Sequence, residues 1–289
     1  MMLPFLALPA PSPSPAEASR VRVMTLNIWN YNDPWEIRRG LIAACITESA
    51  PDVVGLQEIR LDATRSPLDQ AQQIAGLLSD NWRAVYHPAM VYERDPMCAE
   101  GLAVFSRWPI ARSDAVELTR DPSDQADRHQ RIVLHAEIAT PAGPLHFLNT
   151  HWSLSEQARL RNAAETRAVV RRLASGAAVI LVGDLNATPD GASAQALFEP
   201  DSAGGAVLRD AWLTMHPDQP GFTYRCDKPA RRIDYIAYHL SDGAAGRLLD
   251  IRLACCQPTD GVFPSDHMGI VADFGLPARP GRQETPHRV

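Results

Sequence analysis

The stretch that decides the fold is Val179-Ile180-Leu181-Val182-Gly183-Asp184-Leu185-Asn186. A short apolar run that stops at glycine is typical of a strand buried on both faces. Asp184 and Asn186 follow that strand two residues apart, so on an extended chain their side chains point the same way. A buried strand that ends in a carboxylate and an amide predicts a polar site at one end of a sheet.

The same change from an apolar run to polar residues recurs elsewhere along the chain. Further apolar runs predict strands at Val21–Leu26, Val53–Gln57 and Leu145–Leu148. Polar residues terminate most strands, so one such ending means little, but a series that supplies Asp, Glu, Asn or His each time indicates a site. The polar residues that follow these strands, or stand in two later segments, are Asn27, Glu58, His151, Asp234, Asp266 and His267.

The remaining patterns place these endings in a chain of alternating strands and helices. Amphipathic spacing predicts helices at Trp35–Ser49 and Ser155–Leu173. Further strands are expected at Arg131–Ala139, Ile233–Tyr238, Leu248–Ala254 and Ile270–Phe274. We expect one domain over residues 20–276, between proline-bearing flexible tails at 1–19 and 277–289.

The predicted site requires a cation. Glu58, Asp184, Asp234 and Asp266 would repel one another if they were gathered without a counter-charge. Carboxylates and the amide oxygens of Asn27 and Asn186 are hard donors, which suit Mg²⁺, Mn²⁺ or Ca²⁺ better than zinc. Mg²⁺ keeps coordination positions open for water and substrate phosphate. The donor set therefore points to phosphoryl chemistry.

The ordered series of motifs resembles the endonuclease/exonuclease/phosphatase superfamily over about residues 21–276. The residues that carry the resemblance are Asn27, Gln57-Glu58, His151, Gly183-Asp184-Leu185-Asn186, Asp234 and Ser265-Asp266-His267. The resemblance implies a four-layer α/β sandwich like that of pancreatic deoxyribonuclease, in which two packed mixed β-sheets are flanked by helices. It also implies an Mg²⁺-dependent hydrolase, with Mn²⁺ as a substitute.

The roles of individual residues are also implied by the resemblance. Asn27, Glu58 and Asp266 would surround the principal Mg²⁺, while Asp184 and Asn186 would orient the attacking water or hold a second metal. His267, paired with Asp234, would act on that water or stabilise the pentacoordinate phosphate. The residues implied to contact substrate are His151, at the scissile phosphate, and Arg131, by position only.

Two tryptophans next to motif residues, Trp29 and Trp152, are candidates for lining the substrate mouth. His135 and His146 fall within predicted strands, and we interpret them as packed or surface histidines rather than ligands. The five cysteines match no metal-ligand spacing, and adjacent Cys255 and Cys256 are expected in β conformation. A disulfide framework is therefore not expected.

The substrate class stays open at this point. The motifs are closest to uncharacterised bacterial, sphingomyelinase-like and deadenylase-like members, and residues 264–269 are also similar to tyrosyl-DNA phosphodiesterases. We expect a phosphodiesterase acting on nucleic acid or a phospholipid-type headgroup. The alternatives are a phosphomonoesterase of the same superfamily and a non-catalytic binding protein that keeps the fold.

Charge and hydropathy limit the partners. The formal net charge of −6 argues against a broad grip on nucleic acid, because phosphate contacts require a basic surface. No apolar run is long enough to span a membrane. We expect a cytoplasmic monomer, with secretion as the alternative because residues 3–10 are apolar and precede a cleavage-like Ala16-Glu17-Ala18.

Overall fold

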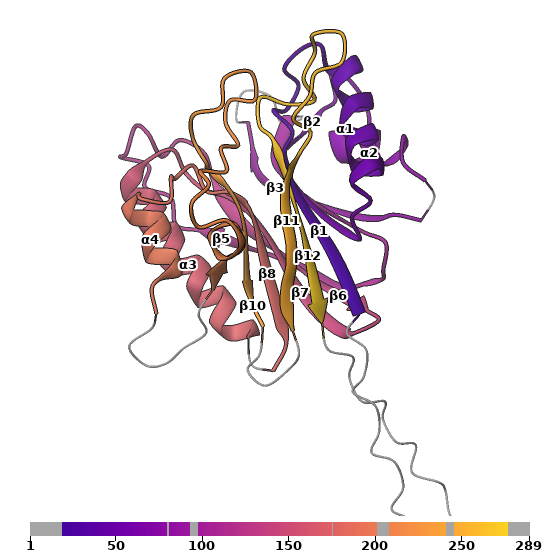
Figure 1. Ribbon diagram of the computed structural model, residues 1–289. Coiled ribbons are helices and arrows are strands. Elements are labelled where there is room, and N and C mark those ends of the chain that lie inside the picture. Colours follow the sequence, from indigo (N-terminus) through magenta and orange to yellow (C-terminus); the bar gives the residue numbers. More distant parts are fainter. Residues whose placement is uncertain are drawn as a thin grey trace, which may run out of the picture.

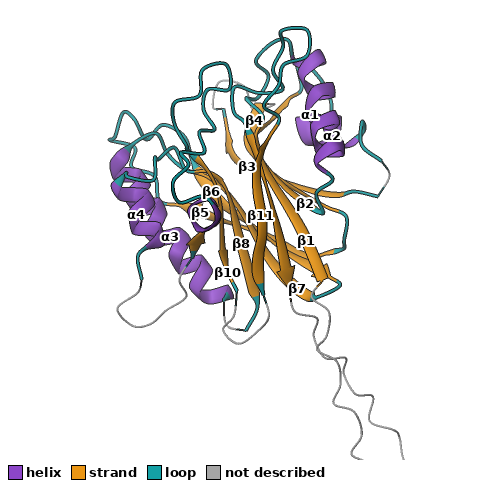
Figure 2. Ribbon diagram, in the orientation of Figure 1, coloured by secondary structure: helices purple, strands orange, loops and turns teal. Residues whose placement is uncertain are grey.

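Two six-stranded β-sheets pack face to face in the computed structural model, with helices on both outer faces (Figures 1 and 2). This is the four-layer sandwich that the sequence predicts. The structure describes residues 19–79, 81–92, 98–174, 176–200, 208–240 and 246–276. Both predicted tails lie outside these residues, except that Ser19 already begins the first strand.

The strand order shows that both sheets are mixed. The first sheet contains, in spatial order, β11 (Arg247–Ala254), β12 (Gly269–Leu276), β1 (Ser19–Asn27), β2 (Val53–Asp62), β4 (Cys98–Ser106) and β3 (Arg83–Val91). The second contains β5 (Ile110–Leu118), β6 (Arg131–Thr140), β7 (Gly143–His151), β8 (Ala178–Asp184), β10 (Asp234–His239) and β9 (Arg209–Asp210). The helices are α1 (Trp35–Ser49), α2 (Gln70–Ala75), α3 (Glu156–Leu173), α4 (Ala192–Phe198) and α5 (Ala211–Met215).

Each sheet has one parallel pair of strands near its middle, joined by a long helix. β1 and β2 are parallel and are connected through α1, while β7 and β8 are parallel and are connected through α3. Asn27 pairs with Gln57 at the end of the first pair, and His151 pairs with Asp184 at the end of the second. Parallel pairing thus brings the polar strand ends of each sheet together.

Three apolar clusters hold the four layers. One lies between the sheets and includes Val23 and Phe147. A second joins α1 and α2 to the first sheet, and a third joins α3 and α4 to the second sheet. Burying a side chain of this size stabilises a fold by about 1.5–3 kcal/mol. The sandwich therefore provides a rigid base for the loops at the strand ends.

A group of buried polar contacts crosses between the middle of the two sheets. The side-chain nitrogen of Gln57 donates to Asn149 Oδ1 at 2.7 Å, and Asn149 donates in turn to the backbone oxygens of Leu56 and Ala103. All of these side chains are buried, so their polar atoms need such partners. The contact fixes the relative position of β2 and β7 just behind the predicted site.

Local patterns predict the two long helices closely, whereas the short helices α2, α4 and α5 were not predicted. The helix at Trp35–Ser49 has the expected bounds, and α3 begins at Glu156 because the Ser155 side chain caps the backbone nitrogen of Ala158. The sequence reading missed β3, β4 and β5. The side chains of β3 and β5 are mixed in polarity and mostly half-buried or exposed, so no simple alternation marks these two strands. β4 is almost entirely buried, and its apolar residues were not recognised as a strand. Among the described residues, no helix combines the length and apolar character needed to cross a bilayer.

The cysteine prediction is wrong. Cys45 on α1 and Cys255 form a disulfide across a sequence separation of 210 residues. β11 ends at Ala254, and Cys255 adopts a left-handed backbone conformation (φ 57°) rather than the expected β conformation. That turn separates it from Cys256 and directs it to α1. A pairing over such a distance leaves no local pattern in the sequence.

Candidate active site

The carboxyl ends of the two parallel strand pairs meet at one end of the sandwich, and the predicted polar residues gather there. They come from both sheets and from two loops. Hydrogen bonds and ion pairs link eight of them in one continuous network, which comprises Asn27, Glu58, His151, Asp184, Asn186, Asp234, Asp266 and His267.

Asn27 joins the two sheets at this end. Its amide nitrogen donates to Glu58 Oε1 at 3.0 Å and to Asp184 Oδ2 at 3.1 Å. Glu58 reaches this position because the pairing of β2 with β4 shifts register between Leu56 and Ile59. Glu58 itself has a φ of 59°, which costs a non-glycine residue free energy and is typical of a side chain directed for function.

Asp184 and Asn186 both face the network, but not through the extended geometry expected from their spacing. Asn186 has a φ of 49°, and its backbone nitrogen donates to Asp184 Oδ1 at 2.8 Å. The Asn186 side-chain nitrogen donates to the backbone oxygen of Trp152 and lies 3.1 Å from His151 Nε2. The same His151 nitrogen is 3.5 Å from Asp184 Oδ2. A tight turn therefore places the three side chains together.

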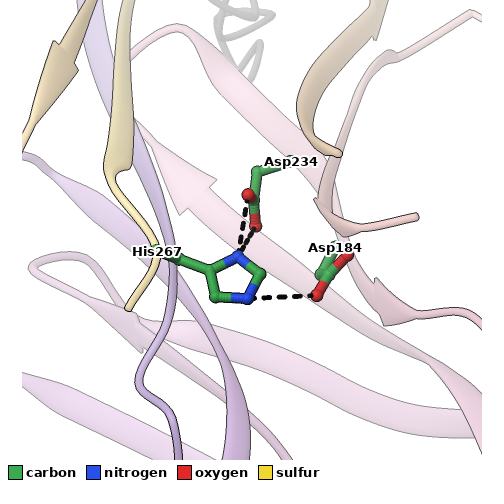
Figure 3. A group of neighbouring side chains, drawn as sticks. All are labelled: Asp184, Asp234 and His267. Atoms are coloured by element: carbon green, nitrogen blue, oxygen red, sulfur yellow. Dashed lines mark hydrogen bonds and ion pairs between the residues drawn. The ribbon is translucent and has the colours of Figure 1, made fainter. Parts of the chain in front are cut away.

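Asp234 and His267 form a pair beside Asp184, as Figure 3 shows. Asp234 lies opposite Asp184 in the pairing of β10 with β8. His267 Nδ1 donates to Asp234 Oδ2 at 2.9 Å, which fixes the ring. The other ring nitrogen, Nε2, is 3.8 Å from Asp184 Oδ2 and 3.9 Å from Asp266 Oδ1. Because these distances are too long for hydrogen bonds, the Nε2 proton is available to another acceptor.

Two further residues hold the loops in place: Ser265, which belongs to a predicted motif but was given no role, and Arg38, which the sequence analysis did not identify. Ser265 Oγ donates to the backbone oxygen of Asn27 at 2.6 Å and accepts from the backbone nitrogen of His267 at 3.1 Å. Arg38, almost fully buried on α1, donates to the backbone oxygens of Ile28, Trp29, Asn30, Asn32 and Pro264. It therefore ties the loop after β1 to the loop that carries His267. A buried arginine in an amphipathic helix gave no distinctive signal, because arginine is the common basic residue of this chain.

Burial strongly shifts the charges of the site. Burial raises the pKa of Glu58 and Asp266, and burial together with the charge of Asp234 raises the pKa of Asp184 to about 7. Burial lowers the pKa of His267, but the charge and hydrogen bond of Asp234 and the charge of Asp184 outweigh it and raise that pKa to about 10. Burial, followed by the charge of Arg131, brings the pKa of His151 well below its ordinary value.

The site has the properties of a cation-binding site. Asp266 Oδ1 is buried without a hydrogen-bond partner, an expensive arrangement for a carboxylate unless a cation approaches it. Glu58 and Asp184 are bonded by amides and lie near histidines, not beside a lysine or arginine ion-pair partner in the described chain. Ligand atoms of Asp184, Asp234 and His267 also lie within 4.8 Å of one another.

Two groupings could thus hold a metal. We favour the oxygen-rich one around Glu58 and Asp266, because Asp234 is already engaged with His267 Nδ1. Asn27 Oδ1 accepts from the backbone nitrogen of Trp29, so its amide nitrogen now faces the carboxylates. Rotation of that amide would present Oδ1 to a cation instead.

The three other residues predicted to contact substrate differ in where the structure places them. Arg131 is buried with Nε unpartnered, and it lines a cavity together with His151 and Glu100. Trp29 is half-buried beside the network and contacts the Arg38 guanidinium. Trp152 cannot line a substrate mouth because its ring is fully buried in the core under α3. The side chains of neighbouring residues point to opposite faces of a strand, and His151 takes the side of the site.

The site also contains an aromatic residue that the sequence reading did not single out. The Tyr224 ring packs against the His267 ring with centroids 4.8 Å apart, and the Arg231 guanidinium lies over the Tyr224 ring, 4.9 Å from its centroid. Tyr224 stands in a loop without an apolar strand before it, so the strand-end pattern could not identify it.

Comparison with known proteins gives a family match and several similar folds. The model of the endonuclease/exonuclease/phosphatase family matches residues 24–267. No curated protein is significantly similar in sequence.

Several solved structures share the fold at low sequence identity. An endonuclease/exonuclease/phosphatase from Beutenbergia cavernae has a TM-score of 0.69 at 24% identity, covering 89% of this chain and 72% of its own. Truncated TDP2 from Caenorhabditis elegans has a TM-score of 0.66 at 20% identity, covering 89% and 97%. A mannosyl-6-phosphatase from Bacteroides thetaiotaomicron has a TM-score of 0.66 at 19% identity, covering 88% and 99%.

Proposed function

Because the chain belongs to the endonuclease/exonuclease/phosphatase family, we propose that it is a divalent-metal-dependent phosphodiesterase that cleaves a P–O bond by attack of water. The observation that carries this proposal is the convergence of Glu58, Asp184 and Asp266 with a paired histidine in one buried network. A binding protein that merely keeps the fold has no need of the Asp234–His267 pair. The complete set therefore favours an enzyme.

The metal would be held by Glu58 and Asp266, with Asn27 after rotation of its amide. Asp184 and Asn186 would orient the attacking water or contribute to a second cation. Mg²⁺ or Mn²⁺ supplies positive charge that stabilises the phosphate oxygens and favours ionisation of water. The unpartnered Oδ1 of Asp266 and the hard donor set support this assignment.

The protein side chains would then position the substrate and move protons. With its pKa raised to about 10, His267 is an imidazolium at neutral pH and can donate from Nε2 to a phosphate oxygen. Asp184, with its pKa raised to about 7, can accept a proton from the attacking water near neutral pH. Neutral His151, held by Asn186, would contact the scissile phosphate together with Arg131.

A phosphomonoesterase is the second candidate. It is supported by the fold shared with a mannosyl-6-phosphatase and by the buried Arg131, since a monoester places more negative charge in the site. The net charge of −6 supports a substrate that is gripped locally rather than a long nucleic acid. Binding to DNA should accordingly depend only weakly on salt.

Metal dependence is the decisive experiment. Chelation should abolish hydrolysis of bis-p-nitrophenyl phosphate, and Mg²⁺ or Mn²⁺ should restore it. Glu58→Gln should increase the Mg²⁺ concentration needed for the half-maximal rate, whereas Glu156→Gln, a matched change on the surface of α3, should not. Full activity in excess chelator would refute the proposal. The substrate panel should include plasmid DNA, single-stranded RNA, sphingomyelin, an abasic oligonucleotide, p-nitrophenyl phosphate and mannose 6-phosphate.

The disulfide bears on where the protein works. Disulfides persist in oxidising compartments and are rare in the cytosol of mesophiles. The Cys45–Cys255 bond therefore supports secretion over the cytoplasmic location expected from the sequence. Thiol labelling of the protein in its native cells, before and after reduction, would distinguish the two. We keep the prediction that the protein is a monomer, to be tested by sedimentation.

A further inference from the structure

A row of three polar side chains crosses the outer face of the second sheet, away from the candidate active site. Asp114 on β5, His135 on β6 and His146 on β7 belong to adjacent strands. His146 is five residues before His151 on the same strand, which corresponds to about 16 Å at 3.3 Å per residue. The proposed catalytic mechanism uses none of the three.

The contacts within the row orient the two rings. Asp114 Oδ1 lies 3.0 Å from His135 Nδ1, and His135 Nε2 lies 3.0 Å from His146 Nδ1. Because Asp114 accepts the Nδ1 proton of His135, the neutral ring keeps a lone pair on Nε2. The sequence analysis interprets both as packed or surface histidines rather than ligands. In the structure, their ring nitrogens face each other.

The surroundings leave the pair accessible. His135 is buried, whereas His146 and Asp114 are partly exposed. An open cavity is lined by Asp114 and His135 together with Arg112, which pairs with Asp114 at 2.8 Å, and with Val169, Arg172 and Leu173 from α3. Burial lowers the pKa of His146, as does the charge of His135, so its ring is neutral at neutral pH. Neutral imidazole is the form that binds metals.

The spacing of the nitrogens fits a chelate. Two imidazole nitrogens bound to one ion at about 2.0–2.1 Å stand about 2.9–3.4 Å apart for angles of about 90–110° at the metal. The observed separation of 3.0 Å falls within this range. An aspartate on the far nitrogen of a ligating histidine is the arrangement that orients such ligands and increases their basicity.

We propose that His135 Nε2 and His146 Nδ1 form a two-histidine site for a late first-row divalent cation such as Zn²⁺, with Asp114 orienting His135. Glu137 lies directly opposite His146 in the β6–β7 pairing, on the same face, and water completes the coordination. The cation replaces the proton between the rings, and His146 then carries its single proton on Nε2, so the pair stays neutral. The proposal does not depend on the proposed catalytic function.

Zinc titration of the chelator-treated protein tests the site. By calorimetry, His146→Gln should remove one Zn²⁺ equivalent relative to the wild type. Asp114→Asn should weaken that equivalent by about 10–100-fold, as the loss of an orienting partner does elsewhere. His87→Gln makes the same change at a half-buried histidine on β3 of the other sheet; it is the matched control and should leave the stoichiometry unchanged.

Measuring hydrolysis distinguishes zinc bound at the two-histidine site from zinc bound at the candidate active site. His146→Gln should retain hydrolysis in Mg²⁺ while losing its zinc equivalent, because the pair lies outside the catalytic network. A Cu²⁺ derivative should show coupling to two nitrogens by electron paramagnetic resonance, reduced to one in His146→Gln. If His146→Gln binds as many zinc ions as the wild type, the two rings are only hydrogen-bonded and the proposal is wrong.

Discussion

The Asp234–His267 pair allows the sharpest test of the proposed mechanism. His267 Nδ1 and Asp234 Oδ2 are 2.9 Å apart, and both side chains are nearly fully buried. Without Asp234 the imidazole loses the partner that fixes its orientation and the charge that keeps it protonated. His267→Ala and Asp234→Ala should therefore damage the same function.

The magnitude follows from the role of the ring. A well-placed side chain that transfers a proton contributes about 10²–10⁴-fold, which is about 2.7–5.5 kcal/mol. We expect each single variant to lower kcat by that factor. Because the two residues act as one unit, the double variant should be within about threefold of the poorer single variant. The Mg²⁺ concentration for the half-maximal rate should change by less than about twofold, since we assign neither residue to the principal metal.

Steady-state hydrolysis of bis-p-nitrophenyl phosphate, measured against Mg²⁺ concentration, gives both quantities. Asp234→Asn adds an independent readout, because removing the charge should lower the His267 pKa from about 10 toward the ordinary value of about 6.5, visible by NMR. Asp210→Asn is the control for stability. It breaks another buried ion pair, with Arg232, and should lower Tm with little effect on kcat.

Losses that multiply in the double variant would refute this reasoning. They would mean that the two residues act independently, and Asp234 would then be better assigned to a metal, together with Asp184 and His267. A large rise in the required Mg²⁺ concentration would point to the same assignment.

Three further predictions follow from the fold. Cys45→Ser with Cys255→Ser should lower the free energy of unfolding by about 5 kcal/mol, because the bond closes a loop of more than 200 residues. Calorimetry should show a Tm lower by about 10–20 °C, and an unchanged Tm would contradict the chain-entropy argument. Arg38→Lys keeps the charge but cannot reach five carbonyls, so it should increase the Mg²⁺ requirement by about tenfold; a normal requirement would show that the two loops hold without it. In chelator-treated protein, the pKa of Asp184 is about 7 in the fold and about 3.9 when unfolded, so stability should fall as pH rises from about 4 to 7. Asp184→Asn should flatten that dependence in thermal denaturation, and an unaltered slope would mean that other groups cause it.

The sequence by itself determined the fold class and most of the candidate site. Buried strands are marked by apolar runs, and the groups that follow them are adjacent in the chain, so a local pattern can identify both. Asn27, His151 and Asp184 were identifiable in this way because each ends a strand of a parallel pair. Parallel pairing then requires those ends to lie at the same edge of a sheet.

Only the tertiary structure decided how the side chains of the candidate site are oriented. Trp152 follows His151 directly, yet its ring is in the core while the histidine faces the site. Glu58 depends on a shift in the pairing of two strands, and strand pairing is not encoded by either strand alone.

The long-range contacts had no local signal at all. Cys45 and Cys255 are 210 residues apart, and their contact depends on α1 packing beside the end of β11. Arg38 reaches Pro264 from a similar distance along the chain. Residue types and periodicity report on a few neighbouring positions, whereas these contacts arise only when both sheets and their helices are assembled. For the same reason, His135 and His146 were ordinary strand residues until pairing brought their rings together.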